Sequence, residues 1–187
     1  MLLEEKENPW ETIKSEIVHE TPWVKISHHE VINPSGNPGK YSITHFKNIA
    51  IGILPLDEDY NTWIVGQYRY PINLYSWEIP EGGGKLDIPP VESAKRELLE
   101  ETGIKAENWT KILEMHLSNS ATDEFGVIFV AKGLTFHEPE PEDDEDLEIR
   151  KIPFDVLFEK VMRGEITDSL TVAGVMKAKL LMDRNQL

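Results

Sequence analysis

The chain has 187 residues, enough to bury one sizeable core and a small additional element. Acidic residues outnumber basic ones by 34 to 19, and the formal net charge of −15 disfavours a nucleic-acid or anionic-membrane surface, because both require basic patches. The absence of cysteine excludes disulfide bonds, thiolate metal sites and a cysteine nucleophile.

The sequence shows neither a secretory signal nor a membrane-spanning segment. The first residues lack the apolar core of a signal peptide. No apolar run approaches the ~20 residues that span a bilayer. We therefore expect a cytoplasmic protein.

Residues 1–47 are predicted to form a small antiparallel sheet. Apolar and polar residues alternate in 13–17 and again in 24–28, as in half-buried strands. The Asn, Pro and Gly residues of 33–39 predict a turn, and 41–46 would be the returning strand. Because a three-stranded sheet of this size is marginal alone, we expect it to pack on the rest of the chain or on a second copy.

The remainder, 48–187, has the pattern of a layered α/β domain. An almost continuous apolar run at 49–56 is consistent with a strand buried on both faces. Further strands are predicted at 62–70, 108–117, 125–131 and 147–152. Helices are predicted at 154–163 and from a cap at Asp168 or Ser169 to Met182.

Residues 78–104 combine a glycine run with a helix. The glycines at 82–84 predict a loop, because glycine destabilises the interior of a strand or helix. Two prolines at 89–90 suit a helix entrance, residues 91–102 are helix formers, and Gly103 is a natural C-terminal stop.

Three glutamates of this helix, Glu97, Glu100 and Glu101, share one face because they are three and four residues apart. Like charges at this spacing oppose helix formation, and a solvated acidic face is one interpretation. A hard divalent cation, which prefers oxygen ligands, would turn the repulsion into coordination. The glycine run that enters the same helix, and the apolar stripe beside the glutamates, favour this second interpretation.

Residues 96–104, R-E-L-L-E-E-T-G-I, resemble the second half of the Nudix box, G-x5-E-x7-R-E-U-x-E-E-x-G-U, in which U is aliphatic. With the box glycine on Gly82 the alignment has no gap, although the first box glutamate falls on Ile88. That glutamate is usually structural in the family, and Asp87 could replace it as the partner of Arg96.

More specifically, the chain resembles the Nudix branch that hydrolyses ADP-ribose and other nucleoside diphosphate sugars. The similarity lies in Q-Y-R-Y-P at 67–71, in E-I-P-E-G at 78–82, and in the N-terminal strand region. It implies a Nudix-type α/β/α sandwich with a central mixed sheet over 48–187, preceded by a small antiparallel sheet over 1–47. Members are commonly dimers whose N-terminal sheets complete the partner's site, so we expect a homodimer formed through 1–47.

The resemblance also implies a metal site. Glu97, Glu100 and Glu101, with the backbone carbonyl of Glu81, would bind Mg²⁺ or Mn²⁺, and Glu100 would be a catalytic residue. A pyrophosphate repels a nucleophile, so a metal must neutralise its charge and acidify a water molecule.

Substrate contacts are assigned in the same way. Arg69 matches the phosphate-contacting arginine of the family, although an arginine at a core edge can also reach solvent without function. Glu78 is assigned to substrate binding with it. Trp23 would stack on a nucleobase across the dimer interface, or belong to the core of the small sheet.

The general base is expected in the acidic stretch 138–148. Glu145 matches best, Glu142 and Asp143 are close rivals, and a solvated charge run is the alternative for each. The six histidines show no metal-binding spacing, and the sequence gives no basis for a Ser-His-Asp arrangement.

The predicted function is a divalent-metal-dependent pyrophosphohydrolase that cleaves a nucleoside diphosphate sugar, first of all ADP-ribose, to a nucleoside monophosphate and a sugar phosphate. One alternative substrate is GDP-mannose or another nucleoside diphosphate sugar. Another alternative is a non-catalytic module that senses ADP-ribose, which only Ile88 supports. Hydrolysis of capped RNA or dinucleoside polyphosphates would call for a more basic surface.

Overall fold

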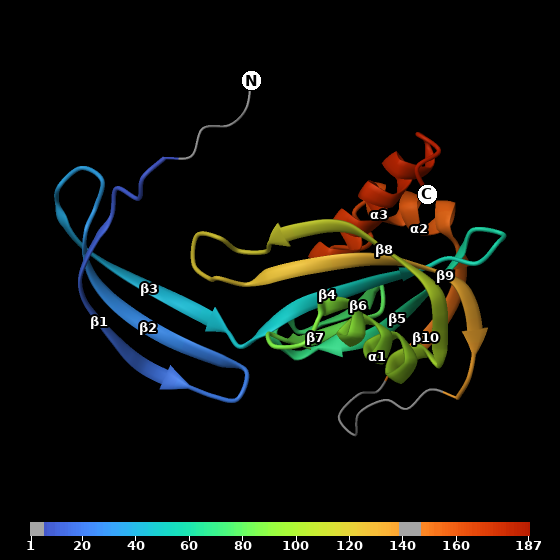
Figure 1. Ribbon diagram of the computed structural model, residues 1–187, viewed down its shortest axis with the longest axis horizontal. Coiled ribbons are helices and arrows are strands. Elements are labelled where there is room, and N and C mark those ends of the chain that lie inside the picture. The colour runs from blue at the N-terminus through green and yellow to red at the C-terminus, as the bar shows by residue number, and fades with distance from the viewer. Residues whose placement is uncertain (1–5, 139–146) are drawn as a thin grey trace. The chain divides into compact units, whose positions relative to one another are not determined.

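The computed structural model describes residues 6–138 and 147–187, which form two compact units (Figure 1). The first unit contains the described residues up to Lys47 together with Ser118–Glu124, and the described residues from Asn48–Leu117 and Phe125–Leu187 form the second. The segment Ser118–Glu124 thus leaves the second unit after one strand and returns to it at the start of the next.

The first unit is a three-stranded antiparallel sheet of order β1-β2-β3. Its strands are β1 (Glu11–Glu20), β2 (Val24–Ile32) and β3 (Pro38–Phe46). Asn33 closes the β2–β3 turn, because its side-chain oxygen accepts from the backbone N–H groups of Ser35 and Asn37. Every residue of β1 is exposed, so this edge strand buries little apolar surface within one chain.

Ser118–Glu124 is attached to β3 through both backbone and side-chain hydrogen bonds. Thr44 donates its backbone N–H to this segment at 3.0 Å. The carboxylate of Asp123 accepts from the backbone N–H of Phe46 at 2.9 Å and lies 2.6 Å from Nδ1 of His45. From the sequence we assigned this segment to the domain 48–187, and no sequence pattern indicates that it binds to β3.

The second unit contains two sheets, of order β7-β4-β9-β8 and β10-β5-β6. Strands β4 and β9 run parallel and the other neighbours antiparallel, so the four-stranded sheet is mixed. A 3-10 helix, Tyr70–Ile72, connects β5 to β6. The strands are β4 (Asn48–Pro55), β5 (Asn61–Arg69), β6 (Leu74–Glu78), β7 (Glu81–Lys85), β8 (Ile104–His116), β9 (Phe125–Phe136) and β10 (Glu148–Pro153).

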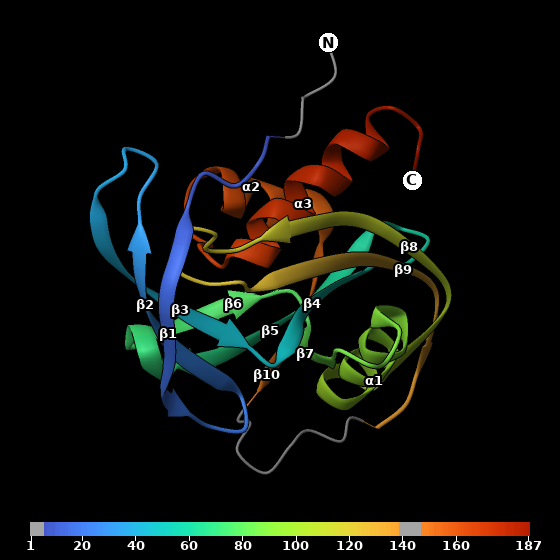
Figure 2. The same cartoon turned by 60° about the vertical axis from the view of Figure 1, so that its left-hand side comes forward.

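Three α-helices cover the second unit: α1 (Pro90–Thr102), α2 (Phe154–Met162) and α3 (Ser169–Met182). Alternate residues of β4 and β9 face opposite ways, so each strand contributes to two cores. One core joins α1 to the sheet through Ala94, Leu98, Ile51, Ile53, Val127 and Phe129. The other joins α2 and α3 through Leu54, Ile128, Val130, Phe154, Leu157, Leu170 and Val175. The expected α/β/α sandwich with a central mixed sheet is confirmed (Figure 2).

Both helix boundaries that the sequence indicated most clearly are present. Gly103 ends α1 with φ 69°, in the left-handed region, and its N–H bonds to the carbonyl of Leu99. At the start of α3 the Asp168 side chain accepts from the backbone N–H of Thr171 at 2.7 Å. Asp168, rather than Ser169, is therefore the cap.

The expectation of a loop at 82–84 is wrong. These glycines form the centre of the edge strand β7, which pairs with β4 from Asn48 to Gly52. A Cβ atom on Gly82 would lie 2.2 Å from the carboxylate carbon of Glu97, so a side chain has no room there. Hydrogen bonding to β4 and this close approach outweigh the modest conformational cost of glycine in a strand.

None of the helices in the described ranges is both long enough and apolar enough to cross a bilayer. The cytoplasmic location stays a prediction.

Candidate functional site

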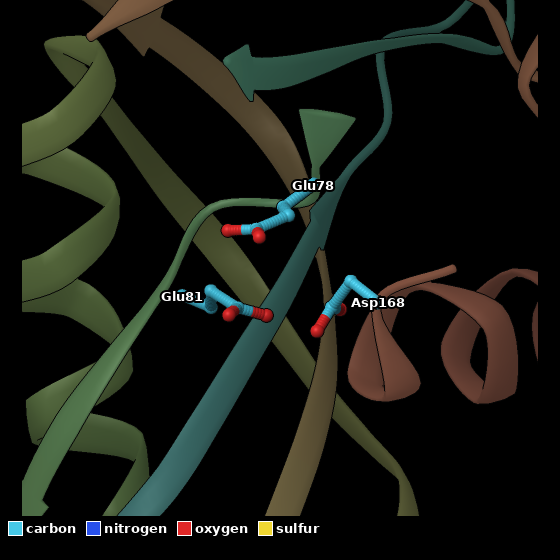
Figure 3. Close-up of side chains that lie close together, drawn as sticks. All are labelled: Glu78, Glu81 and Asp168. Carbon is cyan, nitrogen blue, oxygen red and sulfur yellow. The ribbon is translucent and has the colours of Figure 1, made fainter. Parts of the chain in front are cut away.

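Three carboxylates converge where β6 ends, β7 begins and α3 starts. Glu78 is the last residue of β6, Glu81 the first of β7, and Asp168 the cap of α3; each places a carboxylate oxygen within 4.8 Å of the others. The close-up shows the three side chains directed toward one another (Figure 3). The backbone N–H of Ile79 donates to Oγ1 of Thr171 at 2.9 Å, which fixes the β6–β7 turn against α3.

Arg69, at the end of β5, binds two of these carboxylates. Its Nε lies 3.0 Å from both oxygens of Glu78, and its Nη2 lies 2.8 Å from Oε1 of Glu81. Burial opposes the charge of Arg69, but Glu78 and Glu81 outweigh that effect and raise the pKa of Arg69 above its usual value. The guanidinium is thus a fixed positive charge at the centre of an acidic cluster.

The surroundings of Glu81 disfavour the charged form of its carboxyl group. Burial, followed by the nearby charges of Asp168 and Glu78, raises its pKa well above the usual value, while Arg69 acts in the opposite direction. Its Oε2 atom is buried and has no hydrogen-bond partner among the described residues. An additional cation would therefore stabilise the charged form of Glu81.

The acidic face of α1 is turned toward β7. Glu97 and Glu101 are buried, and Glu100 is partly exposed. Oε2 of Glu101 accepts from the backbone N–H of Glu81 at 2.9 Å, and the carboxylate of Glu97 lies against Gly82. Glu97 and Glu101 therefore border the glycine strand, and Glu101 connects α1 to the Arg69 cluster.

Arg96 balances part of this charge. Its guanidinium lies 2.5 Å from an oxygen of Glu97 and 2.5 Å from one of Glu100, and it donates to the backbone carbonyl of Gly83 at 3.0 Å. Asp87 is not among the partners of Arg96, so that expected pair is wrong. Arg96 pairs instead with two carboxylates of its own helix, Glu97 and Glu100.

The charge of the whole site favours a cation. Two guanidinium groups face six carboxylates, four of which are glutamates of β7 and α1 (Glu81, Glu97, Glu100 and Glu101). Carboxylates and backbone carbonyls are the ligands that Mg²⁺ and Mn²⁺ prefer. With the buried Oε2 of Glu81, the residues present fit a divalent ion.

The remaining residues that the sequence assigns to the site are Trp23 and Glu145. Trp23 belongs to the first unit, in the turn between β1 and β2, with 67% of its surface exposed. It is not a core residue. Glu145, with its rivals Glu142 and Asp143, lies outside the described residues.

Asp168 is the residue of the cluster that sequence reasoning missed. The sequence indicates Asp168 only as a possible helix cap, and the structure confirms that role. The sequence offers no local signal that a cap so far along the chain meets Glu78 and Glu81.

A second arrangement that the sequence did not indicate lies in the first unit. Oγ of Ser27 lies 2.8 Å from Nε2 of His45, whose Nδ1 lies 2.6 Å from Asp123. Ser27 is only 2% exposed, and its hydroxyl is also 2.7 Å from Nε2 of His29. We interpret the group as structural, because a buried hydroxyl shared by two imidazoles has no open side for a substrate.

Comparison with known proteins adds two family matches. The NUDIX domain matches residues 46–169, and the nucleoside diphosphate sugar hydrolase N-terminal domain matches residues 10–43.

Individual proteins are similar over most or part of the chain. The ADP-ribose pyrophosphatase of Mycobacterium tuberculosis is 32% identical over 176 residues, or 91% of this chain and 83% of that protein. A GDP-mannose pyrophosphatase of Salmonella paratyphi B is 32% identical over 118 residues, or 59% of this chain and 57% of that protein. The crystal structure of an ADP compounds hydrolase, 17% identical, has the same fold, with a TM-score of 0.85 over 98% of this chain and 100% of the other.

Proposed function

This chain belongs to the Nudix hydrolase family, and we propose that it is a divalent-metal-dependent pyrophosphohydrolase acting on a nucleoside diphosphate sugar, with ADP-ribose as the leading substrate. The products would be a nucleoside monophosphate and a sugar phosphate. The observation that carries the proposal is the surplus of carboxylates around Arg69, Arg96 and the glycine strand, with the buried Oε2 of Glu81 lacking a partner among the described residues.

The metal ligands we propose are the side chains of Glu97, Glu100 and Glu101 and the backbone carbonyl of Glu81. The carboxylates of Glu78, Glu81 and Asp168 are a neighbouring group of suitable oxygen ligands. A divalent ion bound there would neutralise the diphosphate and lower the pKa of a water molecule. The backbone of β7 can approach a phosphate closely, because Gly82 to Gly84 carry no side chains.

Arg69 is suited to bind a phosphate. Glu78 and Glu81 hold its Nε and Nη2 groups, whereas its Nη1 group donates to none of the described residues. The side chain is about a third exposed, so remaining N–H donors can reach a bound anion. Glu78 then acts by orienting Arg69, and Glu145 remains our proposal for the general base.

The first unit supports a homodimer. Its β1 strand exposes apolar side chains that a soluble monomer would normally cover, among them Ile13, Ile17 and Val18, and the adjacent turn exposes Trp23. A small sheet is stable on its own only where it has an apolar face to bury. We propose that a second copy of the chain covers this surface, and that Trp23 stacks on the substrate base in the dimer.

The deciding experiment is incubation with ADP-ribose and Mg²⁺, with release of AMP followed by chromatography. AMP should appear only with the metal present, and EDTA should stop its formation. Saturable binding of ADP-ribose without release of AMP would instead indicate a non-catalytic module that senses ADP-ribose. Faster turnover of GDP-mannose, the substrate named for the Salmonella relative, would establish the alternative substrate.

A further inference from the structure

A pocket of about 540 Å³ lies between the outer surface of α1 and the first part of β8. Its volume is in the range of sites that hold small molecules. The pocket is lined by Lys95, Arg96, Leu99, Lys105, Ala106 and Trp109. Only Arg96 is shared with the acidic face of α1 described above.

The charge of this pocket is opposite to that of the chain. Half of its lining residues are basic and none is acidic, although the net charge of the chain is −15. Arg96 is already held by carboxylates. Lys95 pairs with the exposed Glu92 at 2.8 Å, and Lys105 forms no ion pair with a described residue. Because an exposed ion pair contributes little stability, both ammonium groups are available to an incoming anion.

The apolar part of the pocket contains a fixed aromatic ring. The indole N–H of Trp109 donates to the backbone carbonyl of Ala106 at 3.1 Å, and the ring meets Phe129 edge-on, with centroids 6.3 Å apart. Trp109 is half-buried, and Leu99 lies beside it in the lining. A half-buried ring with a fixed orientation is a platform on which a flat ring can stack without loss of side-chain freedom.

We propose that this pocket binds a nucleoside monophosphate, with the base on Trp109 and the phosphate between Lys95 and Lys105. Two ammonium groups match the charge of one phosphate dianion. A longer polyanion, such as RNA, would be disfavoured by the net charge of −15 of the chain. The site is independent of the proposed hydrolysis, since it uses neither a metal ion nor the Arg69 cluster.

The test follows the indole N–H signal of Trp109 by NMR in the complete protein, with EDTA present so that no turnover occurs. Trp109→Phe identifies the signal among those of the five tryptophans. AMP should shift it in a saturable manner below about 10 mM, as expected for a modest affinity. Lys105→Glu should weaken the apparent affinity by about tenfold or more, because it replaces a phosphate contact by a like charge.

Lys111→Glu is the matched control, because Lys111 is an exposed lysine of the same strand outside the pocket and the charge change is identical. It should leave the affinity within about twofold, since exposed charges at a distance are screened. Adenosine and inorganic phosphate, added separately, should each bind more weakly than AMP.

Two results would overturn the proposal. One is a Trp109 signal that AMP does not move, or moves equally in the Lys105→Glu protein. The other is an equal response to inorganic phosphate alone, which would reveal an anion site without base recognition. The measurement involves no catalysis, so absence of ADP-ribose hydrolysis in the separate assay would not affect it.

Discussion

At the scale of single residues, the candidate site depends on the absence of a side chain at Gly82. A Cβ atom there would lie 2.2 Å from the carboxylate carbon of Glu97 and 2.4 Å from both of its oxygens. We expect Gly82→Ala to displace Glu97, reduce metal-dependent turnover by about 10²-fold or more and cost about 1–3 kcal/mol of stability through overpacking. Rates of AMP release and thermal unfolding measure the two effects.

Gly39→Ala is the control for that substitution. Gly39 also lies in a strand, but its added Cβ would meet only Val31, at an ordinary contact distance of 3.6 Å. Equal losses of turnover in the two variants would show that the proximity of Glu97 to Gly82 is not what matters.

Glu101 supplies a second test at single-residue scale. It is 1% exposed and accepts a hydrogen bond from the backbone of Glu81. Glu101→Gln keeps the shape and an acceptor oxygen but removes the charge, so we expect turnover to fall by about 10²-fold or more while the far-UV circular dichroism spectrum is retained. Glu92→Gln, on the exposed side of the same helix, should keep the wild-type rate. A rate near wild type for Glu101→Gln would remove Glu101 from the metal site.

Asp57 gives a prediction about pH. Burial opposes its charge, but hydrogen bonds from Lys151 and Asn61 outweigh this and lower the pKa of Asp57 to about 2. A carboxyl whose pKa is lower in the folded state stabilises the fold above its unfolded pKa, near 3.8, and that contribution is lost as the pH falls through about 2. The Lys151 partner is half exposed, so solvent screens the pair, and at neutral pH the contribution amounts to about 1 kcal/mol.

We therefore expect Asp57→Asn to lower the free energy of unfolding in urea at pH 7 by about that amount. The difference from wild type should shrink as the pH is lowered below 4 toward 3. Asp59→Asn, in the same turn, is the control, because the Asp59 carboxylate forms no ion pair with a described residue. A difference that does not vary with pH would rule out the charge of Asp57 as its cause.

At the scale of elements, the attachment of Ser118–Glu124 to β3 depends on Asp123. Burial opposes the charge of Asp123, but hydrogen bonds from His45 and Phe46 lower its pKa below the usual value. Asp123→Ala removes both acceptors, so we expect the backbone N–H of Phe46 to exchange with solvent about tenfold faster or more. Asn119→Ala, in the same segment, should leave that rate unchanged. Equal exchange in both variants would show that backbone contacts alone hold the segment.

At the scale of the whole molecule, the exposed apolar side chains of β1 predict the oligomeric state. We expect Ile17→Lys to convert the proposed dimer to a monomer, because a charge would be buried where apolar side chains meet. Light scattering after size-exclusion chromatography would show the mass fall by half. Glu16→Lys introduces the same side chain at the neighbouring position and should keep the dimer. A wild-type protein that is already monomeric would contradict the proposal directly.

The sequence was sufficient for features that depend on local spacing. The intervals of the helix formers, the two prolines and Gly103 determined α1, its left-handed C-terminal residue and the common face of Glu97, Glu100 and Glu101. Continuous and alternating apolar patterns identified β4 as buried and predicted the layered fold. These inferences succeed because helix and strand periodicity are properties of neighbouring residues.

Only the tertiary structure decided which distant residues meet. Asp168 joins Glu78 and Glu81, Ser118–Glu124 joins the N-terminal sheet, and Lys105 and Trp109 face α1 across a pocket. The glycine run became a strand because β4 provides its hydrogen bonds and Glu97 occupies the space of a side chain. Each of these depends on how separate elements pack against one another, and neither composition nor periodicity records such contacts.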